Sequence, residues 1–281
     1  MIQRLRSVFQ RLRNRLVYDW ILRSYGIRKL RQLNQVSDRS HSHTYTCFYR
    51  SPGQLEALVG PVLSRINTQD LVINIYACSK GAEAYTVASV ISSRHPGLSF
   101  QILASDLHQE TVDYAKAATY TQEEVHAWTV KSDFIEATFD RVGALYRVKP
   151  SIASKVQFSK ISLLDPAGLA KHHRPSQLNL IQNVFCHMSP EMVRQAFANI
   201  LPFVQPGSAL LMDGTPLDLR EELTANAGLQ PLDYRVREIH EFARMHIGAK
   251  WWTYYYGLEP YWPLGRNRTR RYSTIFFKEK R

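Results

Sequence analysis

The segment from residue 71 to residue 89 constrains the fold more than any other part of the chain. It begins with a short β-rich apolar run at residues 71–75, which is typical of a central parallel strand covered on both faces. The small residues Cys78, Ser79 and Gly81 follow, at positions where bulky side chains would keep a ligand away from the backbone. From Ala82 onward the residues favour a helix. This order places a ligand at the carboxyl end of the strand, although an ordinary strand-to-helix turn has a similar sequence.

Further apolar runs repeat this pattern along the chain. Strands are predicted at residues 100–104, 156–161, 178–182, 209–212 and 272–278, and Pro206-Gly207 is predicted to form the turn before the fourth of these. Helices are predicted at residues 52–63, 109–117, 190–201, 217–227 and 236–247, besides the one that begins at Ala82. Strands that alternate with helices indicate an α/β fold with a parallel, doubly wound sheet.

The composition is that of a globular protein with a large core. The chain has 281 residues, of which 44% are hydrophobic, enough for one α/β domain with appendages or for two small domains. Its three cysteines, Cys47, Cys78 and Cys186, are far apart in sequence and form no CxxC pair, so a disulfide framework is not expected. No apolar run approaches the roughly 20 residues of a membrane span, and the start of the chain lacks the apolar core of a signal peptide. We therefore expect a cytoplasmic protein without a transmembrane segment.

The net charge of +12 is concentrated at the two ends of the chain. Residues 1–31 carry nine Lys and Arg against Asp19 alone, and their apolar residues recur at three-to-four-residue spacing. This pattern predicts a basic amphipathic helical segment with a linker over residues 1–43. Such a helix can bind an anionic surface or an acidic partner, or it can dock on its own domain with a solvated arginine face. Residues 44–281 are then the catalytic or binding domain.

Two acidic residues stand where a nucleoside ligand would need them. Glu83 lies just after the glycine turn, and Asp106 ends the second predicted strand, where a carboxylate can accept hydrogen bonds from both ribose hydroxyls. The turn lacks the GxGxxG pattern of dinucleotide folds, and an acidic side chain beside it would repel a pyrophosphate. A cationic or zwitterionic nucleoside such as S-adenosyl-L-methionine therefore suits the turn better.

Six motifs in order make the sequence similar to the chemoreceptor glutamate methyltransferases, the CheR-type family. The family patterns are roughly N-x-T-x-F-F-R, A-x-S-T-G-E-E-P-Y, A-T-D, Y-R-V-K-P followed by V-x-F and N-L-L, R-N-V and K-P-G. The matching segments here are residues 44–50, 77–85, 104–106, 146–150 with 156–158 and 162–165, 182–184 and 205–207. The resemblance covers about residues 44–217.

The resemblance implies a class I methyltransferase fold: a Rossmann-like sheet of about seven strands, the last antiparallel, with a small β-subdomain at about residues 130–155. It also implies the cofactor, S-adenosyl-L-methionine, and the residues around it. Thr46 and Arg50 would approach the methionine end, where the guanidinium of Arg50 would bind the carboxylate and serve as a catalytic residue. Ala77, Gly81 and Glu83 would line the methionyl and amino side, and Asp106 would hold the ribose. The adenine and the mouth of the site would be surrounded by Ser162, Leu163, Gln182 and Asn183.

Several positions depart from the family patterns. Thr44 replaces Asn, Ala82 replaces the first Glu of the pair, and Ser162 replaces the Asn of N-L-L. Asp213 and Pro216 replace a Gly and a Glu of the segment after the K-P-G motif, and His187 replaces a Tyr. If His187 faces the methyl group, it can act as a catalytic base for a phenol, amine or alcohol; otherwise it is a packing histidine.

An aromatic and basic insert at about residues 248–271 has no counterpart in the family patterns. Its aromatic residues and arginines can wall an acceptor pocket, form a lid, or stack the bases of a nucleic acid, which is not the favoured partner. No histidine or cysteine shows the spacing of a metal site, so no metal is expected.

The primary hypothesis is a methyltransferase that forms a methyl ester on a protein carboxylate, as the resemblance implies. The alternatives are a small-molecule O- or N-methyltransferase with His187 as base, and a degenerate methyltransferase fold that serves as a binding module.

Overall fold

The structure is a computed structural model that describes residues 46–247, 257–259, 261–263 and 267–280. The chain divides into two units, Met1–His43 and Thr44–Arg281, and all described residues belong to the second. The helical segment predicted over residues 1–43 and part of the aromatic insert therefore lie outside the described residues. Within the described ranges, no helix is both long enough and apolar enough to cross a membrane.

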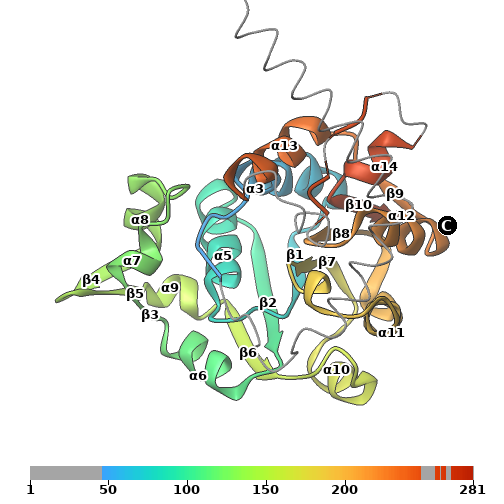
Figure 1. The fold of residues 1–281 in the computed structure, drawn as a ribbon. Coiled ribbons are helices and arrows are strands. Elements are labelled where there is room, and N and C mark those ends of the chain that lie inside the picture. Colours follow the sequence, from blue (N-terminus) through green and yellow to red (C-terminus); the bar gives the residue numbers. More distant parts are fainter. Residues whose placement is uncertain (1–45, 248–256, 260, 264–266, 281) are drawn as a thin grey trace, which may run out of the picture. The chain divides into compact units, whose positions relative to one another are not determined.

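The main sheet has seven strands in the order β6-β2-β1-β7-β8-β10-β9 (Figure 1). They are β1 (Asp70–Tyr76), β2 (Ser99–Asp106), β6 (Val156–Lys160), β7 (Ser176–Gln182), β8 (Val204–Asp213), β9 (Leu229–Pro231) and β10 (Ile275–Lys278). All pairings from β6 to β8 are parallel, whereas β10 runs antiparallel to both β8 and β9. This confirms the class I methyltransferase sheet, with the last strand of the chain antiparallel.

Strand β1 is the centre of this sheet, as the apolar run at residues 71–75 predicts. Its two edges pair with β2 and with β7, so the chain first builds the sheet outward on one side and then returns to build the other. The carboxyl ends of β1 and β7 thus flank the point where the direction of strand addition reverses. In open α/β sheets this point is where ligands bind.

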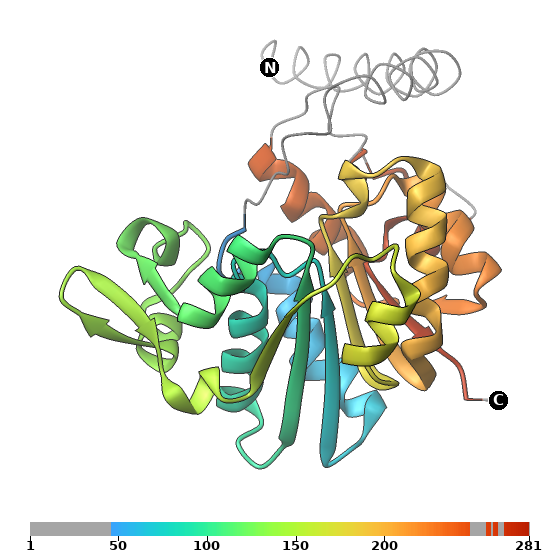
Figure 2. The same cartoon turned by 90° about the horizontal axis from the view of Figure 1, so that it is seen from below.

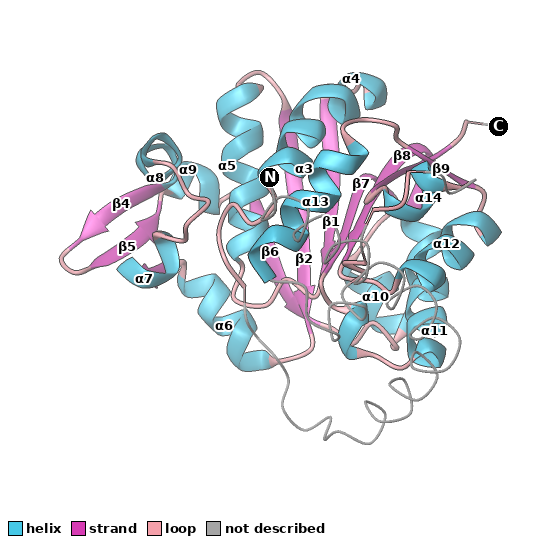
Figure 3. Ribbon diagram, turned by 45° about the horizontal axis from the view of Figure 1, so that its top comes forward, coloured by secondary structure: helices cyan, strands magenta, loops and turns pink. Residues whose placement is uncertain are grey.

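Helices lie on both faces of the sheet (Figures 2 and 3). The alternation along β8 explains the two layers: Ala209 and Leu211 belong to one buried cluster, and Leu210 and Met212 to the other. The first cluster includes residues of α4 (Leu63–Ile66), α5 (Ala82–Arg94) and α6 (Gln109–Ala117). The second includes residues of α10 (Pro166–His172), α11 (Pro190–Ile200) and α12 (Leu217–Asn226).

The helix predicted over residues 52–63 is interrupted. The structure has α3 (Pro52–Ala57), a π-helical turn at Leu58–Val62 and then α4. Gly60 has φ −98° and ψ −107°, which is not helical, and Pro61 has no N–H to donate to the preceding turn. The regular helix therefore ends before this pair and resumes after it.

A second, three-stranded antiparallel sheet stands beside α5 in Figure 1, with the order β3-β5-β4. Its elements are β3 (Thr119–Thr121), α7 (Gln122–Val125), α8 (Ser132–Thr138), β4 (Phe139–Val142), β5 (Leu145–Val148) and α9 (Pro150–Ala153). The small sheet thus starts upstream of residue 130. The ring of Phe48 packs on it, with centroids 4.8 Å from Tyr120 and 5.0 Å from Phe139.

Two predictions near the C-terminal strands are wrong in detail. Pro206-Gly207 is not a turn before a strand, because β8 runs through it; the pairing with β7 shifts register between Ser176 and Leu178, so the extra residues form a bulge. The strand predicted at residues 272–278 is shorter than predicted. It is β10 (Ile275–Lys278), and Tyr272 belongs to the preceding helix α14 (Arg268–Tyr272). The helix predicted over residues 236–247 is α13 (Val236–Ile247).

Candidate functional site

The turn between β1 and α5 has an unusual backbone. Ala77 and Ser79 have φ of 58° and 50°, values that L-residues rarely adopt, and Gly81 has φ of 85°. A Cβ at Gly81 would lie 2.9 Å from the Cβ of Ala115 in α6, so a larger residue would also be too close to its neighbour. Strained residues of this kind gather where a backbone must approach a ligand.

Asp106, the last residue of β2, holds this turn. Its Oδ2 accepts a hydrogen bond of 2.7 Å from the backbone N of Ser79, and its Oδ1 accepts one of 3.1 Å from the N of His108 and one of 3.0 Å from the hydroxyl of Thr111. The carboxylate is buried and is fixed at the carboxyl end of its strand. Each carboxylate oxygen has further acceptor capacity, so the group can also receive ribose hydroxyls.

Glu83 lies in the first turn of α5, where burial raises the pKa of its carboxyl to about 8. The positive charge of Arg50 acts in the opposite direction, and the negative charge of Asp213 adds to the increase. Arg50, Glu83 and Asp213 are therefore within electrostatic reach of one another although they are far apart in sequence. A buried carboxyl with a raised pKa binds a cation well, because the cation restores its charged form.

The two residues before Arg50 position it. Phe48 is buried in the small sheet, and the backbone N of Tyr49 donates to the hydroxyl of Thr86 in α5 at 3.2 Å. Tyr49 itself has φ of 53°, a left-handed turn that precedes Arg50. The short segment from Thr46 to Arg50 is thus fixed between α5 and the small sheet, and Thr46 is half-buried at its start.

Asn183 and its neighbours follow β7. Asn183 has φ of 54° and its N donates to the carbonyl of Asp213 at 3.0 Å, which ties together the segments after β7 and β8. The side chain of Gln182 points to α3, where its Nε2 donates to Oε1 of Gln54 at 2.8 Å. Gln54 in turn donates to the hydroxyl of Thr274 at 2.8 Å. The amide of Gln182 is thus already hydrogen-bonded by the protein.

The segment after β6 contains the other two residues predicted near the adenine. Leu163 is buried and its carbonyl accepts a 3.0 Å hydrogen bond from Nδ2 of Asn199. The hydroxyl of Ser162 accepts from the N of Leu164 at 3.2 Å. These contacts fix the backbone after β6 beside Asp106, since Lys160 and Asp106 are register partners.

His187 is exposed at the end of a 3-10 turn, Phe185–His187. The neighbouring Cys186 is within electrostatic reach of Arg50. Burial raises the pKa of the Cys186 thiol to about 12, while the positive charge of Arg50 acts to lower it. Sequence reasoning did not propose Cys186 or Asp213 as site residues. For Asp213 a signal existed, since it is a carboxylate where the family patterns have Gly.

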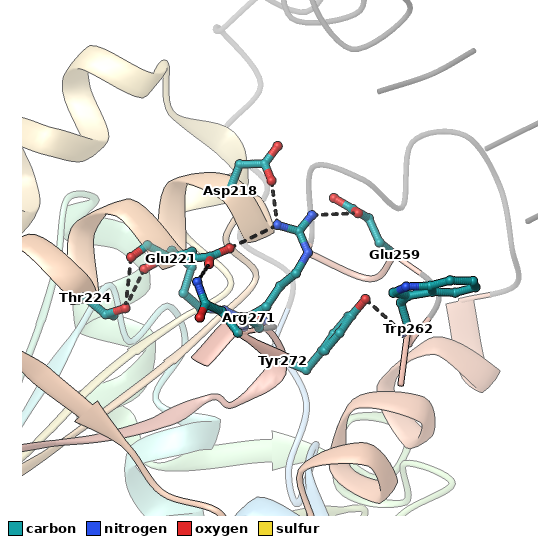
Figure 4. A network of polar contacts seen from close by, with 9 residues as sticks. Asp218, Glu221, Thr224, Glu259, Trp262, Arg271 and Tyr272 are labelled. Atoms are coloured by element: carbon teal, nitrogen blue, oxygen red, sulfur yellow. Dashed lines mark hydrogen bonds and ion pairs between the residues drawn. The ribbon is translucent and has the colours of Figure 1, made fainter. Parts of the chain in front are cut away.

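A network of polar contacts around Arg271 ties the described part of the aromatic insert to α12 (Figure 4). Arg271 binds Asp218, Glu221 and Glu259, with N–O distances of 2.6, 3.3 and 3.0 Å. Gly257 packs so closely on the segment after β8 that a Cβ there would lie 2.1 Å from the carbonyl oxygen of Thr215. Residues 257–259 are therefore anchored next to the carboxyl end of β8.

Arg220 connects this network to the site. Its guanidinium is fully buried; one nitrogen donates to the carbonyl of Arg271 at 2.9 Å and another lies 3.8 Å from Oδ1 of Asp213. Burial lowers the pKa of Arg220 to about 10, and the carboxylate of Asp213 opposes this shift. The charge of Arg220 thus lies between Asp213 and the carbonyl of Arg271.

Among the residues that the structure describes, no cluster of three or more His, Cys, Asp or Glu side chains could hold a metal ion. The site instead consists of a strained turn, a fixed carboxylate at the end of β2, and the basic and acidic side chains of Arg50, Glu83 and Asp213.

The chain is similar to known methyltransferases. The family model described as CheR methyltransferase, SAM binding domain, matches residues 44–219. The chain is 29% identical over 179 residues to Chemotaxis protein methyltransferase 1 of Pseudomonas aeruginosa, covering 59% of this chain and 64% of that protein, which is slightly less than two thirds of its length. It is 23% identical over 203 residues to a Chemotaxis protein methyltransferase of Listeria innocua, covering 70% of each. Among solved structures it is similar to magnesium protoporphyrin IX methyltransferase from Synechocystis with bound SAM, with 14% identity, a TM-score of 0.40, and coverage of 78% of this chain and 85% of that one.

Proposed function

This chain belongs to the CheR family of methyltransferases, and from that premise we propose that it transfers the methyl group of S-adenosyl-L-methionine to a carboxylate oxygen of an acceptor protein. The observation that carries the proposal is the location of the basic side chain of Arg50 within electrostatic reach of the acidic side chain of Glu83, beside the strained turn. The amino acid end of the cofactor has one carboxylate and one ammonium, so this pair complements it. The names of the relatives, chemotaxis protein methyltransferases, support a protein as acceptor.

Each residue of the site has a proposed role. Arg50 binds the carboxylate of the cofactor as a two-pronged donor, Glu83 accepts from its ammonium, and Asp106 accepts from the ribose. Ala77 and Gly81 keep the turn open for the methionyl chain, and Thr46 lies near it. Ser162, Leu163, Gln182 and Asn183 line the adenine side through the segments after β6 and β7.

Methyl transfer to a carboxylate places few demands on the protein. The sulfonium supplies an activated methyl group, and an ionised carboxylate needs no base to attack it, so the protein contributes mainly by holding the two in line. His187 is required as a base only for an acceptor that must lose a proton, such as a phenol or an amine. Its exposed position on the turn next to Cys186 keeps this alternative open to test.

A reducing cytoplasm is the proposed location, because the three cysteines are far apart in sequence and form no CxxC pair. For the basic segment at residues 1–43 the proposed partner remains an acidic protein or an anionic surface, by its charge alone.

A labelled-methyl assay tests the proposed function. The full chain is incubated with cell extract and methyl-labelled cofactor, and the label is measured separately in protein, nucleic acid and small molecules. We expect label in protein that is released as methanol by mild alkali, because methyl esters hydrolyse there whereas methylated amines do not. The His187→Ala variant should label protein as the wild type does. Alkali-stable label that disappears in His187→Ala would instead support a base-assisted reaction, and cofactor binding without any transfer would support a binding module.

Cofactor affinity should depend on pH through Glu83. With a pKa of about 8 its carboxyl is mostly protonated at neutral pH in the empty protein, and a bound ammonium favours the ionised form. Binding of S-adenosylhomocysteine should therefore release a proton at pH 7, and its affinity should rise between pH 6 and 8 by up to about tenfold per pH unit. Calorimetric titration in two buffers of different ionisation enthalpy measures the proton release.

The Glu83→Gln variant is the matched control. It keeps the shape of the side chain but cannot release its proton, so any proton release that remains comes from the ligand or from other groups. Equal proton release in both proteins would remove Glu83 from the ammonium site.

The folding stability of the empty protein should depend on pH in the opposite direction. Because the empty fold favours the neutral carboxyl, the contribution of Glu83 to the free energy of unfolding is fully present below pH 4.5 and is lost as the pH rises through 8.

A further inference from the structure

Lys80 connects the strained cofactor turn to the small sheet. Its Nζ lies 3.0 Å from Oε1 of Glu124 in α7 and 4.7 Å from the centroid of the Tyr114 ring in α6. The family pattern has Thr at the position of Lys80, and a threonine side chain is too short to reach α7. This contact therefore belongs to the present chain, and the roles proposed above do not use it.

Glu124 is fixed from several sides. The hydroxyl of Tyr114 donates to its Oε2 at 2.7 Å, and the backbone N of Thr121 donates to the same oxygen at 3.0 Å as part of a capping box at the start of α7. Although burial acts to raise it, the hydrogen bonds from Tyr114, Thr121 and Lys80 hold the pKa of Glu124 below its usual value. The carboxylate is thus a charged, immobile anchor for the ammonium of Lys80.

The backbone of Lys80 is held by the same part of the molecule. Its carbonyl accepts a 2.6 Å hydrogen bond from the hydroxyl of Tyr120, a buried residue of β3 that packs on Phe48. The other side of the turn is held by Asp106 through the N of Ser79. Residues with positive φ at Ala77, Ser79 and Gly81 are therefore fixed between β2 and the small sheet.

We infer that the Lys80–Glu124 ion pair is a latch through which α7 and the small sheet keep the turn at residues 77–81 in the conformation that binds S-adenosyl-L-methionine. Lys80 and Glu124 are positioning residues that act through the turn. A pair of this exposure, with side chains 36% and 27% exposed, contributes little to global stability. Its effect falls on the local equilibrium of the turn, and the apparent affinity of a ligand falls with the fraction of protein in the competent conformation.

Titration calorimetry with S-adenosylhomocysteine on the full chain tests the latch. We expect Lys80→Met and Glu124→Gln each to weaken binding about fivefold to tenfold. The double variant should bind no more weakly than the single variant with the lower affinity, because both substitutions remove the same interaction. The exchanged pair, Lys80→Glu with Glu124→Lys, should recover part of the affinity. High salt should weaken binding to the wild type more than binding to Lys80→Met, because salt screens the pair.

The matched control is Arg194→Met. It breaks another exposed ion pair, the bidentate one between Arg194 in α11 and Glu222 in α12, and should leave the affinity unchanged. Unchanged affinity in both latch variants, or losses that add in the double variant, would overturn the inference, as would a fall in the melting temperature without a change in affinity. The wild-type titration establishes cofactor binding separately, so failure of the latch is distinguishable from failure of the cofactor assignment.

Discussion

Replacement of Asp106 by alanine is expected to weaken binding of S-adenosylhomocysteine by about two orders of magnitude or more. The carboxylate has two tasks in the structure. It is placed to accept from the ribose, and it already accepts from the N of Ser79 at 2.7 Å, the N of His108 at 3.1 Å and the hydroxyl of Thr111 at 3.0 Å. Alanine removes the ligand's partner and also leaves the N–H groups of Ser79 and His108 without theirs, so the turn loses its conformation. Calorimetric titration measures the affinity.

Two further variants separate these tasks. Asp106→Asn keeps one acceptor oxygen and the shape of the side chain, so an intermediate loss of about tenfold is expected. Asp113→Ala removes an exposed carboxylate of α6 that accepts from Gln109 and should leave the affinity unchanged. Wild-type affinity in a well-folded Asp106→Ala protein would contradict the placement of the ribose at the end of β2.

The central part of the fold could be predicted because its strands are covered on both faces. Residues 71–75 and 100–104 are apolar apart from Asn74 and Gln101, and they form most of β1 and β2, where most of their side chains are buried. Such runs have few alternatives in a globular protein. The antiparallel last strand, in contrast, came from the family resemblance, since no pattern within residues 275–278 states the direction of a strand.

The elements that sequence reasoning missed are short or irregular. In β4 only Phe139 is buried, so three of its four residues give no alternation, and the small sheet could not be delimited from periodicity. Strand β8 contains Pro206 and Gly207, which in sequence indicate a turn; the bulge that accommodates them depends on its neighbour β7. A pattern of single residues does not contain this information.

The same distinction holds for the site. Arg50, Glu83 and Asp106 could be proposed because each stands in a motif. The electrostatic effect of Asp213 on Glu83 and the hydrogen bond from Gln182 to Gln54 connect segments more than a hundred residues apart. They depend on how the carboxyl ends of the strands meet, which only the folded chain determines.

Gly214→Ala should be among the most destabilising substitutions in the site. Gly214 has φ of 60°, and a Cβ there would lie 2.4 Å from the Cα of Asn183 and 2.9 Å from its N. Both obstacles are backbone atoms, and Asn183 cannot retreat because its N donates to the carbonyl of Asp213. We expect the free energy of unfolding to fall by about 3 kcal/mol or more, and cofactor binding to be lost with the displacement of Asn183.

Gly228→Ala separates the two causes of this effect. Gly228 has φ of 67°, similar to Gly214, but nothing lies within 4 Å of the Cβ that alanine would add. Its variant therefore carries only the cost of a left-handed alanine, about 1–2 kcal/mol, and should bind the cofactor normally. Urea unfolding gives the free energy of unfolding of both variants, provided that its slope with urea concentration is the same in both. The difference between the two free energies measures the contact between the segments after β7 and β8. Equal losses in the two variants would mean that these segments separate easily, and that Asn183 is not held in place by Gly214.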